Sequence, residues 1–390
     1  MSIFGWIVTA YAVVFSLAWC ALYLRSMHTI LVSQSFDDRD PTEPDDWPTL
    51  SIIVPACNEA DTIEQALQTL LGQDYPDLEI VLVNDRSTDG TGEIIDRIAE
   101  KDGRIRTVHI DTLPDGWLGK VHALHLATRE STGEWVLYTD ADVHYEEGTL
   151  RKAVAVAASD ELDHLALLPR VQVGSFWLDI LIRAFGLLLF QKTRARLIGR
   201  PGSNAFIGIG AFNLVRRSAF DKTEGFEWLR MEVADDVGLG LMLQRSGARP
   251  AFAIAVDSIS VVWQPSIRAM AGCLDRLGHF GLPTVLAGCA SVWAVFFGPL
   301  VAILCSPVPY LWLLGVAAYL CTAVNAVAWT ARIKRIKYGI VPSLLVPFGF
   351  LAMSILMIRS VVLCKVRGGV VWRDTLYPIE ALRAGRRVRL

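Results

Sequence analysis

The sequence lacks the features that several large classes of protein require. Its formal net charge is only -3, so its overall charge does not suggest nucleic-acid binding. Its seven cysteines include no Cys-x-x-Cys pair, which leaves a disulfide scaffold and a cysteine-ligated metal without support. No glycine-rich phosphate loop of either common type follows a strand-like segment. This absence argues against a P-loop nucleotidase and a dinucleotide-dependent dehydrogenase.

Apolar residues dominate what is present. They make up 53% of the 390 residues, charged residues only 20%, and the mean hydropathy is +0.39. This balance is too apolar for an ordinary soluble enzyme and too charged for a bare channel. The composition therefore favours a membrane protein that carries a sizeable water-soluble domain.

The first apolar run covers residues 3–24 and contains no charge. It is long enough to cross the roughly 30 Å hydrocarbon core as a helix. A cleaved signal peptide is the alternative, but no Lys or Arg precedes the run, which favours an uncleaved anchor over residues 1–25. Because positive charge first appears at Arg25 and Arg39, we expect the following domain to face the cytoplasm, at the inner membrane.

Three further apolar runs cover residues 284–306, 309–331 and 340–363, so we expect a multi-pass protein with a cytoplasmic domain over 37–280. The loop between the last two runs is basic (Arg332, Lys334, Arg335 and Lys337), as a cytoplasmic loop should be. A fourth full crossing over 284–364 would export the tail over 365–390, although that tail is also basic. Pro342, Pro347 and Gly349 could instead break the last run into a re-entrant or interfacial hairpin. The sequence leaves both alternatives open.

Residues 176–197 mix apolar and charged side chains. They fit a helix that lies flat at the lipid headgroups, and equally a core helix of the soluble domain.

Residues 50–142 alternate between strand-like and helix-like patterns, which is typical of βαβ units and an α/β parallel sheet. The expected strands cover residues 50–54, 79–83, 104–110 and 134–139, and the expected helices include 61–71 and 120–130.

Acidic side chains follow three of these strands, in Asn58-Glu59, in Asp85 to Asp89 and in Asp140-Ala141-Asp142. Each cluster alone could serve as a turn or a helix cap. Since open α/β sheets bind ligands at the carboxyl ends of their strands, the three together predict one ligand-binding crevice.

The Asp140-x-Asp142 pair supplies the hard oxygen ligands that suit Mg²⁺ or Mn²⁺. Such an ion commonly shares its coordination with substrate phosphates, and it would stabilise a diphosphate leaving group. Lys120 begins a helix after a glycine-containing loop and could add a positive charge on the same phosphates, although it could also be an ordinary surface lysine.

Together these residues resemble the nucleotide-sugar transferases of glycosyltransferase family 2. The matching motifs are Ser51-Ile52-Ile53-Val54-Pro55 with Asn58-Glu59, Val83-Asn84-Asp85-Arg86-Ser87-Thr88-Asp89-Gly90-Thr91, Gly119-Lys120, Asp140-Ala141-Asp142 and Asp235-Asp236. The resemblance covers residues 50–280 and implies a GT-A fold, a nucleotide-sugar donor and inversion at the sugar carbon. It places Pro55, Glu59, Asp85, Lys120 and Asp140 at the donor, and Asp140 and Asp142 at the metal.

The resemblance also implies that Asp236, with Asp235 before it, is the catalytic base. The residues themselves agree, because 237–245 reads as a helix and both carboxylates lie in its first turn. A helix N-terminus favours negative charge, so we expect Asp236 to stay ionised and ready to take a proton from an acceptor hydroxyl. A capping aspartate without chemistry is the alternative. The small-residue loop at 208–213 resembles the family's acceptor-side loop.

Two departures from the family pattern bear on the product. Processive members carry a Gln/Arg-x-x-Arg-Trp motif after the base, and no Arg-Trp occurs here, so a single transfer to a lipid or polyprenoid hydroxyl is expected. The tail over 368–377 resembles that of lipid-modifying members, including the hopanoid-associated transferases. The alternatives are a processive polysaccharide synthase and a non-catalytic sugar-nucleotide sensor.

Overall fold

A computed structural model describes residues 2–305, 307–333 and 337–388, which form two compact units. The apolar unit comprises the chain up to Val32, Val173–Lys192 and Gln264–Trp372. The sheet unit comprises Ser33–Gln172, Thr193–Trp263 and the chain from Arg373. The domain boundaries expected from the sequence stay predictions, and Lys334, Arg335 and Arg389 lie outside the described residues.

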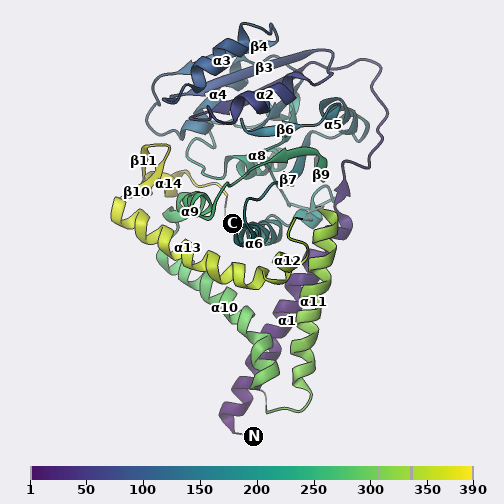
Figure 1. The fold of residues 1–390 in the computed structure, drawn as a ribbon, viewed down its shortest axis with the longest axis vertical. Coiled ribbons are helices and arrows are strands. Elements are labelled where there is room, and N and C mark those ends of the chain that lie inside the picture. The colour runs from purple at the N-terminus through teal and green to yellow at the C-terminus, as the bar shows by residue number, and fades with distance from the viewer. Residues whose placement is uncertain (1, 306, 334–336, 389–390) are drawn as a thin grey trace. The chain divides into compact units, whose positions relative to one another are not determined.

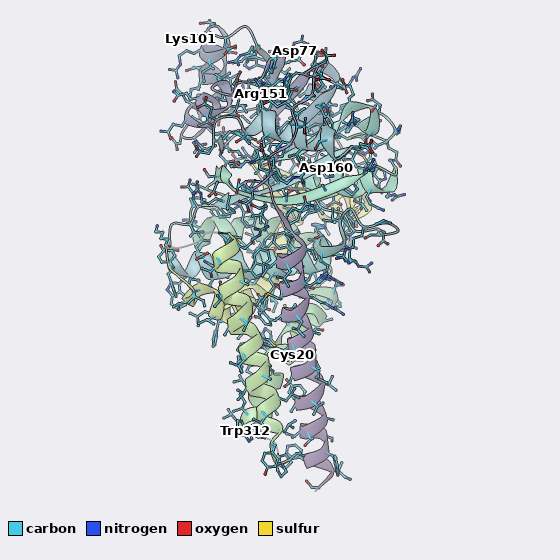
Figure 2. The ribbon with its side chains drawn as sticks, turned by 90° about the vertical axis from the view of Figure 1, so that its right-hand side faces the viewer. Cys20, Asp77, Lys101, Arg151, Asp160 and Trp312 are labelled. Carbon is cyan, nitrogen blue, oxygen red and sulfur yellow. The ribbon has the colours of Figure 1, made fainter. Side chains whose placement is uncertain are left out.

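Among its described residues, the apolar unit holds four helices that are long and apolar enough to cross a membrane, one for each predicted run. They are α1 (Ile3–Val32), α10 (Leu282–Leu304), α11 (Leu311–Arg332) and α13 (Val346–Arg367). The helices α1, α10 and α11 pack side by side, and Figure 2 shows Cys20 on α1 and Trp312 on α11.

Polar side chains join α1 to α11 inside this apolar unit. The Trp19 indole N–H donates to the Thr322 hydroxyl at 2.9 Å, and the Trp329 indole N–H donates to the Ser26 hydroxyl at 2.7 Å. Such bonds fix helix pairs where the hydrophobic effect gives little preference.

The last apolar run is interrupted near its start, at Leu345, and the full crossing and the re-entrant hairpin both stay predictions. A short helix, α12 (Val341–Leu344), precedes α13, and Pro347 lies in the first turn of α13, where its missing N–H costs nothing. The helix α6 (Phe176–Lys192) packs against α13, and a Cβ on Gly349 would lie 2.9 Å from the Ile180 carbonyl oxygen. The helix α6 thus belongs to the apolar unit and not to the sheet unit, and its interfacial position stays a prediction.

The sheet unit is built on one mixed, mostly parallel sheet, in which nine strands lie within the described residues. The four predicted strands are confirmed as β2 (Leu50–Ala56), β3 (Leu78–Asp85), β4 (Ile105–Ile110) and β5 (Trp135–Tyr138), and they pair in parallel. The other strands are β1 (Gln34–Ser35), β6 (Val143–Tyr145), β7 (His164–Val171), β8 (Asn213–Arg216) and β9 (Pro250–Val261).

The sheet order is β1-β9-β7-β8-β5-β2-β3-β4, and β6 pairs with β9. The strand β8 runs antiparallel to both β5 and β7 and joins the first half of the sheet to the second. Figure 1 shows the helices of this unit covering the sheet. The helices of the sheet unit include α2 (Ile63–Leu71), α3 (Thr91–Ala99), α4 (Gly119–Glu130), α5 (Thr149–Ser159), α7 (Arg217–Phe220) and α8 (Asp235–Arg245).

The core of the sheet unit consists of apolar side chains from adjacent strands, among them Ile52, Ile80, Leu82 and Leu137, which are all fully buried. A sheet buried on both faces explains why these strands read as continuous β-branched and leucine runs. The helix α9 (Ile267–Asp275) precedes α10, and α13 is followed by β10 (Gly369–Trp372), β11 (Thr375–Pro378) and α14 (Ile379–Gly385).

Candidate active site

The loops that follow β2 and β3 are locked together by side-chain to backbone hydrogen bonds. The Asn58 side-chain oxygen accepts from the Thr88 N–H at 2.8 Å, and Asp89 accepts from the Ala60 N–H at 3.0 Å. Asp89 also accepts a hydrogen bond from the Thr91 N–H at the start of α3. Asp89 therefore stabilises the turn before this helix, which is the turn or cap role given above as the alternative to ligand binding. These bonds fix the end of the crevice at which Pro55 and Glu59 lie; Pro55 stands opposite Val83 of β3.

Asp85, at the end of β3, is buried and held by its neighbour. The Arg86 guanidinium donates to both carboxylate oxygens, at 2.7 and 3.0 Å. A Cβ on Gly119 would lie 2.5 Å from the Asp85 Oδ2 atom, so only glycine allows α4 to begin this close to the end of β3. This close approach places Asp85 beside α4, the helix that carries Lys120.

Lys120 joins the two halves of the predicted site. Its Nζ atom lies 2.7 Å from Asp140, at the end of β5, and 3.2 Å from Asp235, at the start of α8. Burial alone would lower the pKa of Lys120, but the charges of Asp140 and Asp235 outweigh it and raise that pKa, so the ammonium stays charged. A cavity is lined by Lys120, Asp140 and Asp236 together with the apolar Phe226 and Leu239.

Asp236 follows Asp235 in the first turn of α8 and faces the same cavity. Its carboxylate accepts hydrogen bonds from the backbone N–H groups of Gly210 at 2.9 Å and Val237 at 2.7 Å. Burial, with the charge of Asp235, nevertheless raises the pKa of Asp236 to about 7. The expectation that the helix N-terminus keeps this carboxylate fully ionised is therefore wrong, because desolvation and a like charge outweigh the backbone N–H groups.

The glycine loop over residues 208–210 comes close to both acidic groups. A Cβ on Gly208 would overlap the Asp236 carbonyl oxygen, and a Cβ on Gly210 would lie 2.6 Å from the Asp140 Oδ2 atom. Asn213 holds this loop, because its side chain exchanges hydrogen bonds with the backbone of Ile209 and pairs with His164 at 3.0 Å. The glycines at 208 and 210 thus allow the backbone of this loop to lie close to Asp236 and Asp140.

Asp140 and Asp142 are the side chains that would hold a divalent cation, which commonly shares its coordination with phosphates. Burial and the charges of Asp140 and Glu59 raise the pKa of Asp142 to about 7, which marks a site with excess negative charge. Within the described part of the chain, no group of three or more His, Cys, Asp or Glu side chains is placed to hold a metal. A site with only two carboxylates suits Mg²⁺ or Mn²⁺, because these ions keep water and phosphate ligands. They do not need a site in which the protein supplies every ligand.

Two arginines at the site were not assigned a role from the sequence. Arg86 lies inside a recognised motif, and its position next to Asp85 was the only signal for the pair. Arg373 donates to Glu59 at 2.7 Å from 314 residues further along the chain. No local pattern predicts a pairing over such a distance.

Comparisons with known proteins bear on the family and the fold of the chain. Residues 51–223 match the family model described as Glycosyl transferase family 2. This segment is similar to the family 2 glycosyltransferases. The matched segment ends before α8, so the carboxylates Asp235 and Asp236 lie beyond it.

Curated relatives include glycosyltransferase AglD of Haloferax volcanii, 30% identical over 55% of this chain and 33% of its own length. They also include a beta-monoglucosyldiacylglycerol synthase of Synechocystis, 28% identical over 50% of this chain and 40% of its own. In these two comparisons the chain spans 33% and 40% of the relative's length.

One solved structure matches over almost the whole chain. It is the mannosyltransferase PcManGT from Pyrobaculum calidifontis in complex with GDP-Man and Mn²⁺, with a TM-score of 0.55. The match covers 92% of this chain and 99% of the other, at 22% sequence identity. At that identity the likeness shows the GT-A fold alone, which confirms the fold expected from the sequence.

Proposed function

We propose that the chain is a membrane-anchored, inverting glycosyltransferase. It transfers one sugar from a nucleotide-diphosphate sugar to a hydroxyl group of a lipid or polyprenoid acceptor. The observation that carries the proposal is the position of Lys120, within 3.2 Å of both Asp140 and Asp235. This lysine joins the donor-side carboxylates at the strand ends to the acidic pair of α8 in one cavity.

The residues divide the work as follows. Glu59 and Asp85 bind the nucleoside, and Lys120 stabilises the negative charge that grows on the diphosphate. Asp236 removes the proton from the acceptor hydroxyl while the oxygen of that hydroxyl attacks the sugar carbon. Asp235 forms an ion pair with Lys120. A base with a pKa of about 7 suits this task, since it is half ionised and still basic at neutral pH. A divalent ion held by Asp140 and Asp142 would supply further charge neutralisation at the diphosphate.

The four apolar helices motivate the acceptor. An enzyme that takes a water-soluble sugar nucleotide needs a membrane anchor chiefly when its other substrate lies in the bilayer. The name of the Synechocystis relative, a diacylglycerol glycoside synthase, is consistent with a lipid acceptor, and so is the resemblance of the tail to hopanoid-associated transferases. We place the sheet unit on the cytoplasmic side of the inner membrane, because the first positive charges, Arg25 within α1 and Arg39 after it, follow the first apolar run.

A processive polysaccharide synthase of the same family is the second candidate. It would use the same crevice, but the chain lacks the Arg-Trp motif of such enzymes. Mass spectrometry of the product separates the two, because a synthase yields a ladder of lengths and the proposed enzyme yields a single addition.

The proposed base is tested with Asp236→Asn, which keeps the size of the side chain and removes its basicity. A panel of sugar nucleotides with Mn²⁺ first identifies the donor by its stabilisation of the folded protein against heat. We then expect Asp236→Asn to bind that donor normally and to transfer about 10² to 10⁴ times more slowly, the usual contribution of a general base. Asp77→Asn, an exposed change before β3, is the matched control (Figure 2). Turnover near wild type in Asp236→Asn would exclude this base.

A further inference from the structure

The C-terminal segment, residues 373–388, is docked onto the sheet unit along the proposed donor site. Tyr377, Leu382 and Val388 are buried, which distinguishes this segment from a free basic tail. The backbone N–H groups of Arg387 and Val388 both donate to the Glu232 carboxylate, at 2.6 and 2.8 Å. These contacts fix one end of the segment three residues before Asp235.

The other end of the C-terminal segment reaches three elements that carry proposed donor residues. Arg373 donates to Glu59, which follows β2, at 2.7 Å. The Thr375 hydroxyl accepts from Arg86, whose guanidinium holds Asp85, at 3.2 Å. The Tyr377 hydroxyl accepts from the Gly119 N–H, next to Lys120, at 3.3 Å.

The turn that presents Arg373 is one that an arginine rarely occupies. Arg373 and Asp374 both have positive φ angles, +49° and +61°. Glycine, asparagine and aspartate are favoured in this region, and other side chains are strained there. Backbone strain of this kind persists where the surrounding structure holds it and is concentrated at functional sites. Asparagine at position 373 would adopt this positive φ angle with less strain than arginine does.

The Arg373–Glu59 ion pair is too exposed to be explained by stability. The two side chains are 37% and 25% exposed, and ion pairs at such positions contribute little to folding. The pair does restrict Glu59, because one carboxylate oxygen is bound by Arg373 while the other lies 3.3 Å from the Thr62 hydroxyl.

We propose that Arg373, Thr375 and Tyr377 of the C-terminal segment are components of the donor site, in which Arg373 is a positioning residue that orients Glu59 toward the nucleoside. This inference rests on the proposed function, since Glu59 needs orienting only if a donor binds there. Thr375 acts in the same way on Asp85 through Arg86. The acidic donor crevice is therefore completed by residues from the far end of the chain.

The test is Arg373→Asn in the full-length protein, with the donor found in the sugar-nucleotide panel. Asparagine fits the positive φ angle, so we expect an unchanged or higher melting temperature without donor. Since hydrogen bonds to charged groups are worth tenfold or more in affinity, we expect the donor KM to rise about tenfold or more, with kcat within about twofold. Arg373→Lys keeps the charge and should recover part of the loss.

Asp374→Asn is the matched control, because it makes a similar change at the next residue of the same turn. It should leave the donor KM within about twofold of wild type. If Arg373→Asn binds the donor as wild type does, or if Asp374→Asn weakens binding equally, the positioning role is refuted. If the wild-type protein itself binds no sugar nucleotide with Mg²⁺ or Mn²⁺, the proposed function fails first, and the two failures are thereby distinguished.

Discussion

Gly210 offers a sharp test of the site, because the three atoms nearest to a methyl group there all belong to the Asp140 carboxylate. A Cβ at this position would lie 2.6 Å from the Asp140 Oδ2 atom, whereas ordinary contacts begin at 3.4 Å. In Gly210→Ala the carboxylate must therefore move by about 0.8 Å, away from its 2.7 Å contact with Lys120. The φ angle of Gly210 is not positive, so alanine can adopt the backbone conformation.

A displacement of about 1 Å at a reacting centre costs roughly 10²-fold in rate, so we expect kcat/KM for transfer to fall by about that factor in Gly210→Ala. We also expect more Mn²⁺ to be needed for half-maximal activity, since Asp140 is a proposed metal ligand. The assay is transfer of a radiolabelled sugar to extracted lipid, with Mn²⁺ varied. Gly103→Ala, where a Cβ meets nothing within 4 Å, is the control and should stay within about twofold. Wild-type activity and metal dependence in Gly210→Ala would refute the assigned position of Asp140.

Two further predictions concern pH. Burial and Asp235 raise the pKa of Asp236 to about 7, and the base must be ionised to act. We therefore expect kcat/KM to fall about tenfold for each pH unit below 7 and to level off above it. A value of kcat/KM that is constant from pH 5.5 to 8 would contradict this prediction. Burial lowers the pKa of His164 from 6.5 to about 4, so the unfolded chain takes up its proton first as pH falls, and the fold should lose about 3 kcal/mol between pH 6.5 and 4. Denaturation in detergent at pH 6.5 and pH 4 measures this loss. His164→Gln should show a smaller loss, and an equal loss in that variant would assign the effect to other groups.

The sequence predicted the first half of the sheet because its signals are local. The strands β2 to β5 are continuous apolar runs separated by helical patterns, and βαβ connections allow few arrangements other than parallel neighbours. The strand β8 was not predicted to run antiparallel, because its direction depends on the path of the chain after β7 and not on its own four residues.

The chemistry of the site divides in the same way. The sequence by itself determined which residue types follow the strands, and therefore that Asp85, Asp140 and Asp142 would share one edge of the sheet. Only the tertiary structure decided that Lys120 stands between Asp140 and Asp235, and that Asp236 has a raised pKa. Burial and the distance between charges are properties of the packed chain. For the same reason the pairing of Arg373 with Glu59, 314 residues apart, follows from no pattern of neighbouring residues.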